Sequence, residues 1–291
     1  MAYSPPVYPT DIPTIADLPD RADLTDIIYA ARYNELKKEL RAALTELGTL
    51  PKGTFADVTT RLGVVLYKTT SSKTYYVDGD NGTDDQEHGS GTGTNAFATI
   101  QYAINQVPKY LAHSTLIYVA DCVYSITSAI TIEGFVGYGY LFIRGSVSTI
   151  PAIGHYVIDT GANNITGFSI TGCSALIMIQ GFYIDSDTQL NRGINCLYNH
   201  SVQIKYTRVH NFYIGAYLSW GFGEISVCDL DDNDYGIYVS YSTFIFSMNN
   251  ISSTTNDAFG MTSHGSTICK SGTQSTGAGG DEHITGGGEI R

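Results

Sequence analysis

The chain has 291 residues, of which 43% are hydrophobic and only 15% charged, and its formal net charge is −12. This length allows one large domain or two modest ones, and the 31 glycines and 22 tyrosines favour strands and turns over helices. Basic residues cluster only at Lys37, Lys38 and Arg41, which argues against nucleic-acid binding. The sequence has no run of 18 apolar residues, which argues against membrane insertion.

Residues 1–22 are expected to form an extended anchoring arm, and residues 23–50 a long α-helix that Asp23 can cap. Apolar residues recur at alternating spacings of three and four, the pattern of a heptad seam, at Tyr29, Tyr33, Leu36, Leu40, Ala43, Leu47 and Leu50. The helix either packs on its own domain or joins identical chains as a short coiled coil. We favour the coiled coil, because the neighbouring segments offer no core. The seam tyrosines leave room for three strands, so the expected assembly is a homotrimer.

The stretch YNELKKELRAALTELGTLPKGTFADVTTRL is similar to the N-terminal segment of many bacteriophage tail and tail-fibre proteins. There, a helix runs into a Leu-Gly-Thr turn and a Val-x-x-Arg-Leu ending. The resemblance covers residues 24–62 and is carried by Asn34, Gly48, Pro51, Gly53, Val58, Arg61 and Leu62. It implies a virion tail protein that attaches to other tail or baseplate proteins through its arm. The polar N-terminus has no secretory signal pattern, so we expect assembly in the host cytoplasm.

A linker is expected over residues 51–74, followed by a strand at Tyr75, a Gly/Asp-rich loop, and a short amphipathic helix over residues 96–107. The loop does not fit the ligand spacing of an EF-hand calcium site. A looser cation site from Asp78, Asp80 and Asp84 is the alternative, but we expect neither a metal nor a cofactor. The helix is expected to cover an open end of an apolar core.

The segment FATIQYAINQVP resembles the segment that opens right-handed parallel β-helix proteins of the pectin-lyase-like class. The resemblance implies a mainly β fold, in which a parallel β-helix over residues 75–270 follows the arm and the helix. It implies the fold but not an activity. Residues 271–291 are a glycine-rich tail, which is either a flexible linker or, as in phage tail proteins, a set of strands that finish inside a trimer.

A repeat with the period of one coil supports this fold. Glycine recurs at Gly193, Gly215 and Gly236, and asparagine at Asn211, Asn233 and Asn256. Both sets are expected at corners, where positive φ suits them. Three apolar columns are expected to point inward: Ile204 with Ile225 and Phe246, Tyr206 with Val227 and Met248, and Val209 with Leu230 and Ile251.

The carboxylates give no clear catalytic pair. The repeat places Asp185 in one column with Thr207, Cys228 and Asn249, so acidic residues do not face each other across neighbouring coils. The weak catalytic candidates are Glu224, Asp229 and Asp232. The five cysteines lack a CxxC motif, which favours small buried thiols over disulfides or a zinc site.

Three aromatic residues, Tyr198, Trp220 and Tyr241, share one column of the repeat. A ladder of rings can stack on sugars or pack against a neighbouring chain. We therefore expect a tail-spike or tail-fibre protein that binds a host-surface polysaccharide and mediates adsorption. A polysaccharide depolymerase and a purely structural tail spacer are the alternatives, and we lean against an enzyme.

Overall fold

The computed structural model describes residues 34, 37–38, 68–145, 148–252 and 255–291. The chain divides into two units, Met1–Val65 and Leu66–Arg291. In the first unit only Asn34, Lys37 and Lys38 are described, and all three are helical. The predicted arm and every residue of the predicted trimerisation seam lie outside the described residues, so the coiled coil and the homotrimer stay predictions. No helix among the described residues is long and apolar enough to cross a membrane.

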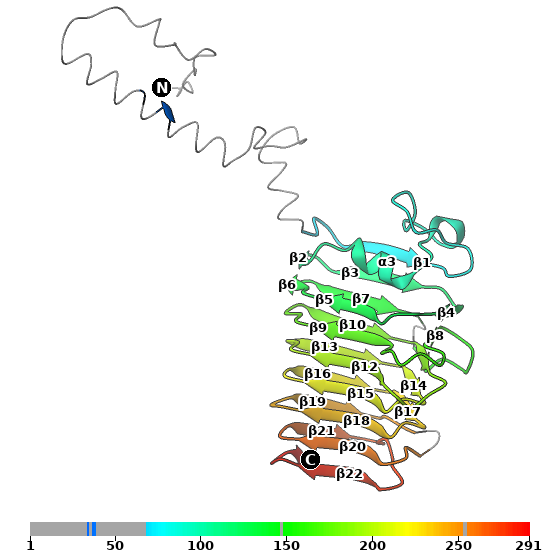
Figure 1. The fold of residues 1–291 in the computed structure, drawn as a ribbon, viewed down its shortest axis with the longest axis vertical. Coiled ribbons are helices and arrows are strands. Elements are labelled where there is room, and N and C mark those ends of the chain that lie inside the picture. The colour runs from blue at the N-terminus through cyan, green and yellow to red at the C-terminus, as the bar shows by residue number, and fades with distance from the viewer. Residues whose placement is uncertain (1–33, 35–36, 39–67, 146–147, 253–254) are drawn as a thin grey trace, which may run out of the picture. The chain divides into compact units, whose positions relative to one another are not determined.

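The second unit is a parallel β-solenoid of the right-handed type with about seven turns, which confirms the predicted β-helix (Figure 1). Three parallel sheets form its walls. Sheet 1 contains, in spatial order, β1 (Lys73–Val77), β3 (Thr115–Val119), β7 (Tyr140–Arg144), β10 (Leu176–Gln180), β13 (Ser201–Lys205), β16 (Phe222–Ser226), β19 (Phe244–Met248), β21 (Thr267–Ser271) and β23 (Glu289–Ile290).

Sheet 2 contains β4 (Val123–Ser125), β8 (Val157–Asp159), β11 (Tyr183–Asp185), β14 (Arg208–His210) and β17 (Asp229–Asp231). Sheet 3 contains β5 (Ile130–Glu133), β9 (Phe168–Thr171), β12 (Arg192–Leu197), β15 (Ile214–Ser219), β18 (Tyr235–Ser240), β20 (Phe259–His264) and β22 (Gly280–Thr285). A small fourth sheet pairs β2 (Tyr110–Leu111) with β6 (Val136–Gly137). The glycine-rich segment 271–291 thus carries β22 and β23, so the solenoid continues beyond residue 270.

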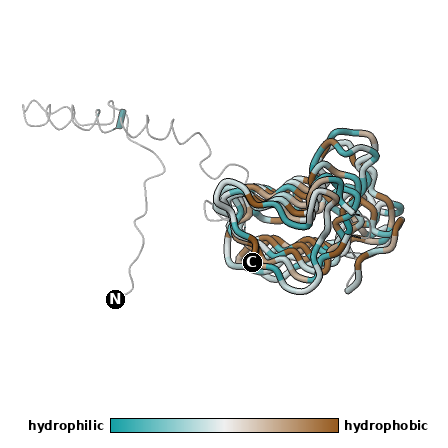
Figure 2. The backbone as a smooth tube through the Cα atoms, turned by 90° about the horizontal axis from the view of Figure 1, so that it is seen from below, coloured by the Kyte–Doolittle hydropathy of each residue, from teal (hydrophilic) through white to brown (hydrophobic). Residues whose placement is uncertain are grey.

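The core is built from aliphatic columns that run along the solenoid. On sheet 1, register pairing stacks Ile117, Ile143, Ile179, Ile204 and Ile225, all with no exposed surface. Successive side chains of a strand point to opposite faces, and here every second residue enters the core. Figure 2 looks along the stacked coils and shows hydrophobic residues recurring at the same places in successive coils.

The predicted strand register is wrong where the number of residues per coil changes. Ile225 pairs with Ser247, so Phe246 points outward and is 41% exposed. A change of one residue reverses the face that a side chain occupies.

The same slip affects the other predicted columns. Val209 stacks on Leu230, as predicted, but Ile251 is exposed. The remaining column is not inward at all. Tyr206 and Val227 have positive φ at the turn after sheet 1, and Met248 ends β19 with its side chain partly exposed.

The recurring glycines and two of the asparagines do not serve as positive-φ corners. Gly215 lies inside β15 with ordinary φ, and a Cβ there would come within 2.8 Å of the Gly236 carbonyl oxygen, so close packing requires glycine. Asn233 is buried; its Oδ1 accepts from the Phe212 N–H at 2.9 Å, and its Nδ2 donates to the Val209 carbonyl at 3.0 Å. Such asparagines satisfy turn backbone that is cut off from water. Of the three recurring asparagines, only Asn211 has a positive φ, of 62°.

The two ends of the solenoid are finished differently. The 3-10 helix η2 (Gly93–Asn95) leads to α3 (Ile100–Asn105), which is shorter than the predicted helix over residues 96–107 and begins after its N-cap Thr99. Ile100, Ala103 and Ile104 of α3 are buried against the first coil. At the other end the interior becomes polar, with Ser247 and Ser263 buried and Lys270 paired with Glu282. Polar terminal coils keep a stack of strands from associating further.

Candidate functional site

Three aromatic residues form a ladder on the corner between sheet 3 and sheet 1, as their common column predicts. Tyr198, Trp220 and Tyr241 directly follow β12, β15 and β18. The Tyr198 and Trp220 rings are stacked with centroids 6.3 Å apart, and the Trp220 and Tyr241 rings with centroids 5.8 Å apart and planes within 7°. The three side chains are 62%, 48% and 51% exposed. This set is the aromatic ladder below.

The ladder residues adopt backbone conformations that are unfavourable for residues other than glycine. Their φ values are 55°, 57° and 55°, in the left-handed region. The register places Gly134 and Gly172 in the same column before the ladder, and Gly265 and Gly286 after it, all with positive φ. A non-glycine residue in this region costs about 1–2 kcal/mol. Three exposed aromatic residues at such positions make this corner a candidate binding surface.

A shallow groove runs beside the ladder. It has a volume of about 530 Å³ and is lined by Asn199, His200, Ser201, Gly221, Phe222 and Ser242. Phe222 is exposed and stacks on Phe244 with centroids 5.6 Å apart. The groove offers a hydroxyl, an imidazole and an apolar wall next to the ladder, which suits a ligand that is polar at its rim and apolar on its faces.

Most ring faces of the ladder contact another ring of the ladder. Trp220 has Tyr198 on one face and Tyr241 on the other. The His264 and Tyr241 rings pack nearly perpendicular to each other, with centroids 5.8 Å apart. Within the described part of the chain, Tyr198 has a stacked ring on one side, Trp220, so a ligand meets ring edges and hydroxyl groups along the ladder and a ring face at Tyr198. The sequence predicts the column but not this orientation.

A second cluster lies on the outer face of sheet 2. Register pairing stacks Asp185 on His210 and His210 on Asp231. His210 Nδ1 lies 2.8 Å from Asp185 Oδ1, and His210 Nε2 lies 3.4 Å from Asp232 Oδ2. The imidazole is thus held between two carboxylates, an arrangement that can orient a general base or acid. This set of Asp185, His210, Asp231 and Asp232 is the acid–base cluster below.

A repeat of constant period in the sequence does not bring the residues of the acid–base cluster together, because the coils differ in length. Asp185 pairs with His210, not with Thr207 as predicted. A usable signal lies in four of the five strands of sheet 2, each of which reads as a variable residue, an aliphatic residue, and then Asp or His. These strands are Val157–Asp159, Tyr183–Asp185, Arg208–His210 and Asp229–Asp231.

The three catalytic candidates from the sequence are not brought together as one site. Glu224 lies on sheet 1, where Lys205 Nζ is 2.9 Å from its carboxylate. Asp229 is completely buried on sheet 2, and its Oδ2 accepts from Arg208 Nη2 at 2.7 Å. Only Asp232 joins the acid–base cluster.

Burial and neighbouring charges shift the protonation of the acid–base cluster. Burial, reinforced by repulsion from Asp229, raises the pKa of Asp231 to about 6, against the attraction of His210 and Arg208. Among the described residues, no group donates a hydrogen bond to Asp231 Oδ1. The hydrogen bond to Asp185 is the main cause that raises the pKa of His210. Both groups therefore bind a proton more readily than an ordinary histidine or aspartate does.

The buried Asp231 carboxylate is expected to lower stability at neutral pH. Its pKa in the folded chain is about 6, above the ordinary value of about 3.9. Its contribution to the free energy of unfolding is therefore greatest below about pH 4 and declines as pH rises toward about 6. Asp231→Asn should be more stable than wild type by roughly 1–3 kcal/mol at about pH 7.5, and the gain should shrink at about pH 4.5.

Urea unfolding at these two pH values measures this effect. The half-exposed Asp232 is the matched control, and Asp232→Asn should change stability by no more than about 0.5 kcal/mol. A destabilised Asp231→Asn chain at neutral pH, or a gain that is equal at both pH values, would contradict the prediction.

The predicted cation loop is held together by hydrogen bonds. Asp84 accepts from the Ala98 N–H at 2.8 Å and the Thr99 N–H at 3.0 Å, so it anchors the start of α3. Asp78 and Asp80 instead lie near Cys122, with potential ligand atoms within 4.8 Å of one another. Burial raises the pKa of the Cys122 thiol, which opposes the thiolate form that a metal prefers. The four cysteines from Cys122 to Cys228 are buried and free, as the composition predicts.

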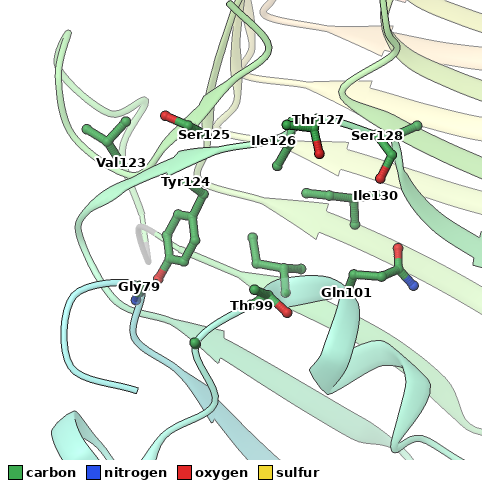
Figure 3. Close-up of a pocket in the computed structure, with 13 residues that line it drawn as sticks. Gly79, Thr99, Gln101, Val123, Tyr124, Ser125, Ile126, Thr127, Ser128 and Ile130 are labelled. Atoms are coloured by element: carbon green, nitrogen blue, oxygen red, sulfur yellow. Dashed lines mark hydrogen bonds between the residues drawn. The ribbon is translucent and has the colours of Figure 1, made fainter. Parts of the chain in front are cut away.

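A pocket of about 380 Å³ opens between α3 and the first coil (Figure 3). Gly79, Thr99 and Gln101 line one side, and residues 123–130 line the other. The Tyr124 hydroxyl accepts from the Gly79 N–H at 3.3 Å and donates to the Ala120 carbonyl at 3.2 Å, and burial raises its pKa. The residues that line this pocket therefore offer no general base near neutral pH.

No protein-family model, no curated protein and no solved structure matches this chain. The function therefore has to be argued from the chain's own residues.

Proposed function

We propose that the chain is a structural component of a bacteriophage tail that binds a host-surface glycan, and that the aromatic ladder is its binding element. The observation that carries this proposal is the set of three exposed rings at left-handed backbone positions on one corner of successive coils. Side chains that pack a core or end a turn do not need this combination. The resemblance of residues 24–62 to phage tail proteins is the reason for placing this binding on a phage tail.

The chemistry of the ladder suits a carbohydrate. Tyrosine and tryptophan combine an apolar ring with a polar tip, and a sugar likewise combines apolar C–H faces with a rim of hydroxyl groups. Contacts of this type are individually weak. A homotrimer would present three ladders on one particle, so that binding to a multivalent cell surface gains from effective concentration.

Cleavage of the glycan is the second candidate function, and the acid–base cluster favours it. His210 lies between Asp185 and Asp232, and the neighbouring Asp231 has a pKa of about 6. A carboxyl group with a raised pKa is what general acid catalysis requires. The cluster is on sheet 2 and the ladder on the corner between sheets 3 and 1, so the two sites are distinct.

Trp220→Ala tests the binding proposal. We expect the variant to lose at least about tenfold in binding to a printed array of bacterial polysaccharides, because removal of the central ring leaves Tyr198 and Tyr241 unsupported. Tyr213, a 44% exposed aromatic residue on a different corner, provides the control Tyr213→Ala, which should bind as wild type does. Circular dichroism should show that both variants keep the solenoid.

Three outcomes would change this conclusion. Wild-type protein that binds nothing on the array, or Trp220→Ala protein that binds normally, makes the ladder a structural or chain-packing element. Wild-type protein that shortens a bound polysaccharide on a sizing column replaces binding with cleavage.

A further inference from the structure

The aromatic ladder ends abruptly on the side of Tyr198. The column position one coil before Tyr198 is Gly172, and the position before that is Gly134. A Cβ built on either glycine would meet no heavy atom within 4 Å. Coils are about 4.8 Å apart, so beside the Tyr198 ring a stretch of this column roughly 10 Å long carries no side chain. We call this open stretch the recess.

The other faces of the ladder are less accessible. Both faces of Trp220 are covered by tyrosines, and the His264 ring packs nearly perpendicular to the Tyr241 ring. Tyr198 is also the most exposed of the three, at 62%. Among the described residues, the Tyr198 ring therefore carries the ladder's one uncovered face.

We propose that a single pyranose ring of the glycan stacks on this face of Tyr198, inside the recess above Gly172 and Gly134. The inference rests on the proposed glycan-binding function and gives it a position and a direction. Stacked rings have centroids about 4.5–7 Å apart, so the recess has the height for one sugar ring. The exposed side chains of Ser174 and His200 lie on the same corner and offer hydrogen-bonding groups to the sugar hydroxyls.

The proposal fits a difference between the two ends of the ladder. Glycines follow the ladder in the column on both sides, but the His264 ring lies against Tyr241 at one end and close to Gly286. Among the described residues, no ring lies against Tyr198 on the side of Gly172, so a sugar can stack there. Each chain then makes one stacking contact, which keeps the affinity of a single chain low.

A matched pair of substitutions tests the recess. Gly172 and Gly265 flank the ladder in the same column, with φ of 63° and 60°, and asparagine tolerates this region. Gly172→Asn places an amide on the free face of Tyr198 and should weaken binding to the same polysaccharide array roughly tenfold. Gly265→Asn, beyond the opposite end, should bind within about twofold of wild type. Thermal melting checks that both variants fold.

A second pair of variants tests the stacking of a sugar on Tyr198 if Gly172→Asn fails to fold. Tyr198→Leu removes the ring on which the sugar stacks, whereas Tyr241→Leu removes the ring at the far end of the ladder. Both variants should weaken binding, because both rings belong to the ladder, but Tyr198→Leu should lose clearly more. Equal losses at both ends, with Trp220→Ala also defective, would overturn the recess but leave glycan binding intact. Normal binding by all these variants, or no glycan binding by wild type, would overturn the proposed function itself.

Discussion

Replacement of Arg208 by alanine is expected to destabilise the solenoid by about 3–5 kcal/mol at neutral pH. Arg208 Nη2 and Nε donate to the same oxygen of Asp229, at 2.7 and 3.1 Å, and the Asp229 side chain has no exposed surface. The substitution leaves this carboxylate buried without its guanidinium partner, and the desolvation cost is no longer offset. The variant also loses the position of the guanidinium over the Tyr183 ring, 5.9 Å from its centroid.

Two comparisons separate this effect from a general loss of charge. Lys205 and Glu224 form a more exposed pair on sheet 1, with side chains 27% and 18% exposed, so Lys205→Ala should cost no more than about 1 kcal/mol. The double variant Arg208→Met/Asp229→Leu should regain most of the stability, because neither charge of this pair is then left buried without its partner. Urea unfolding of the four chains measures each step. Equal losses for Arg208→Ala and Lys205→Ala would show that burial of Asp229 is not the cause.

The fold could be predicted because a β-helix repeats its chemistry. The residues from Phe97 to Pro108 resemble the opening of such proteins, and the recurring apolar residues from Phe182 to Ile268 indicate stacked strands. The aromatic ladder was also predictable, since its residues follow the ends of three strands of nearly constant length. Local pattern and tertiary contact coincide in such a fold, because each coil packs mainly on its neighbours.

The acid–base cluster and part of the core could not be predicted with one constant period. The turns between strands change length from coil to coil, and a change of one residue reverses the face that a constant period predicts for the strand that follows. Asp185 was therefore paired with the wrong residue, and Phe246 and Ile251 were placed in the core although both are exposed. The stacking of the rings on one another is likewise a property of side-chain packing that no spacing encodes.

Truncation of Ile225 to alanine is expected to cost roughly 2–5 kcal/mol, the range for a buried aliphatic residue that leaves a cavity. Ile225 has no exposed surface and lies in the core column between Ile204 and Ser247. Because strands are paired on both sides of β16, the sheet has little freedom to collapse into the space left by the lost atoms.

Phe246→Ala is the comparison that tests the register between β16 and β19 directly. A constant coil length would place Phe246 in the same core column as Ile225, and its truncation would then cost about 3–5 kcal/mol. In the observed register Phe246 is 41% exposed and contacts Phe222 and Phe244 only at ring edges. Its truncation should therefore cost no more than about 1.5 kcal/mol, the contribution of an aromatic pair. Denaturant unfolding in which Phe246→Ala proves as damaging as Ile225→Ala would mean that the coil after β18 is one residue shorter than the structure has it, and that Ser247, not Phe246, faces the solvent.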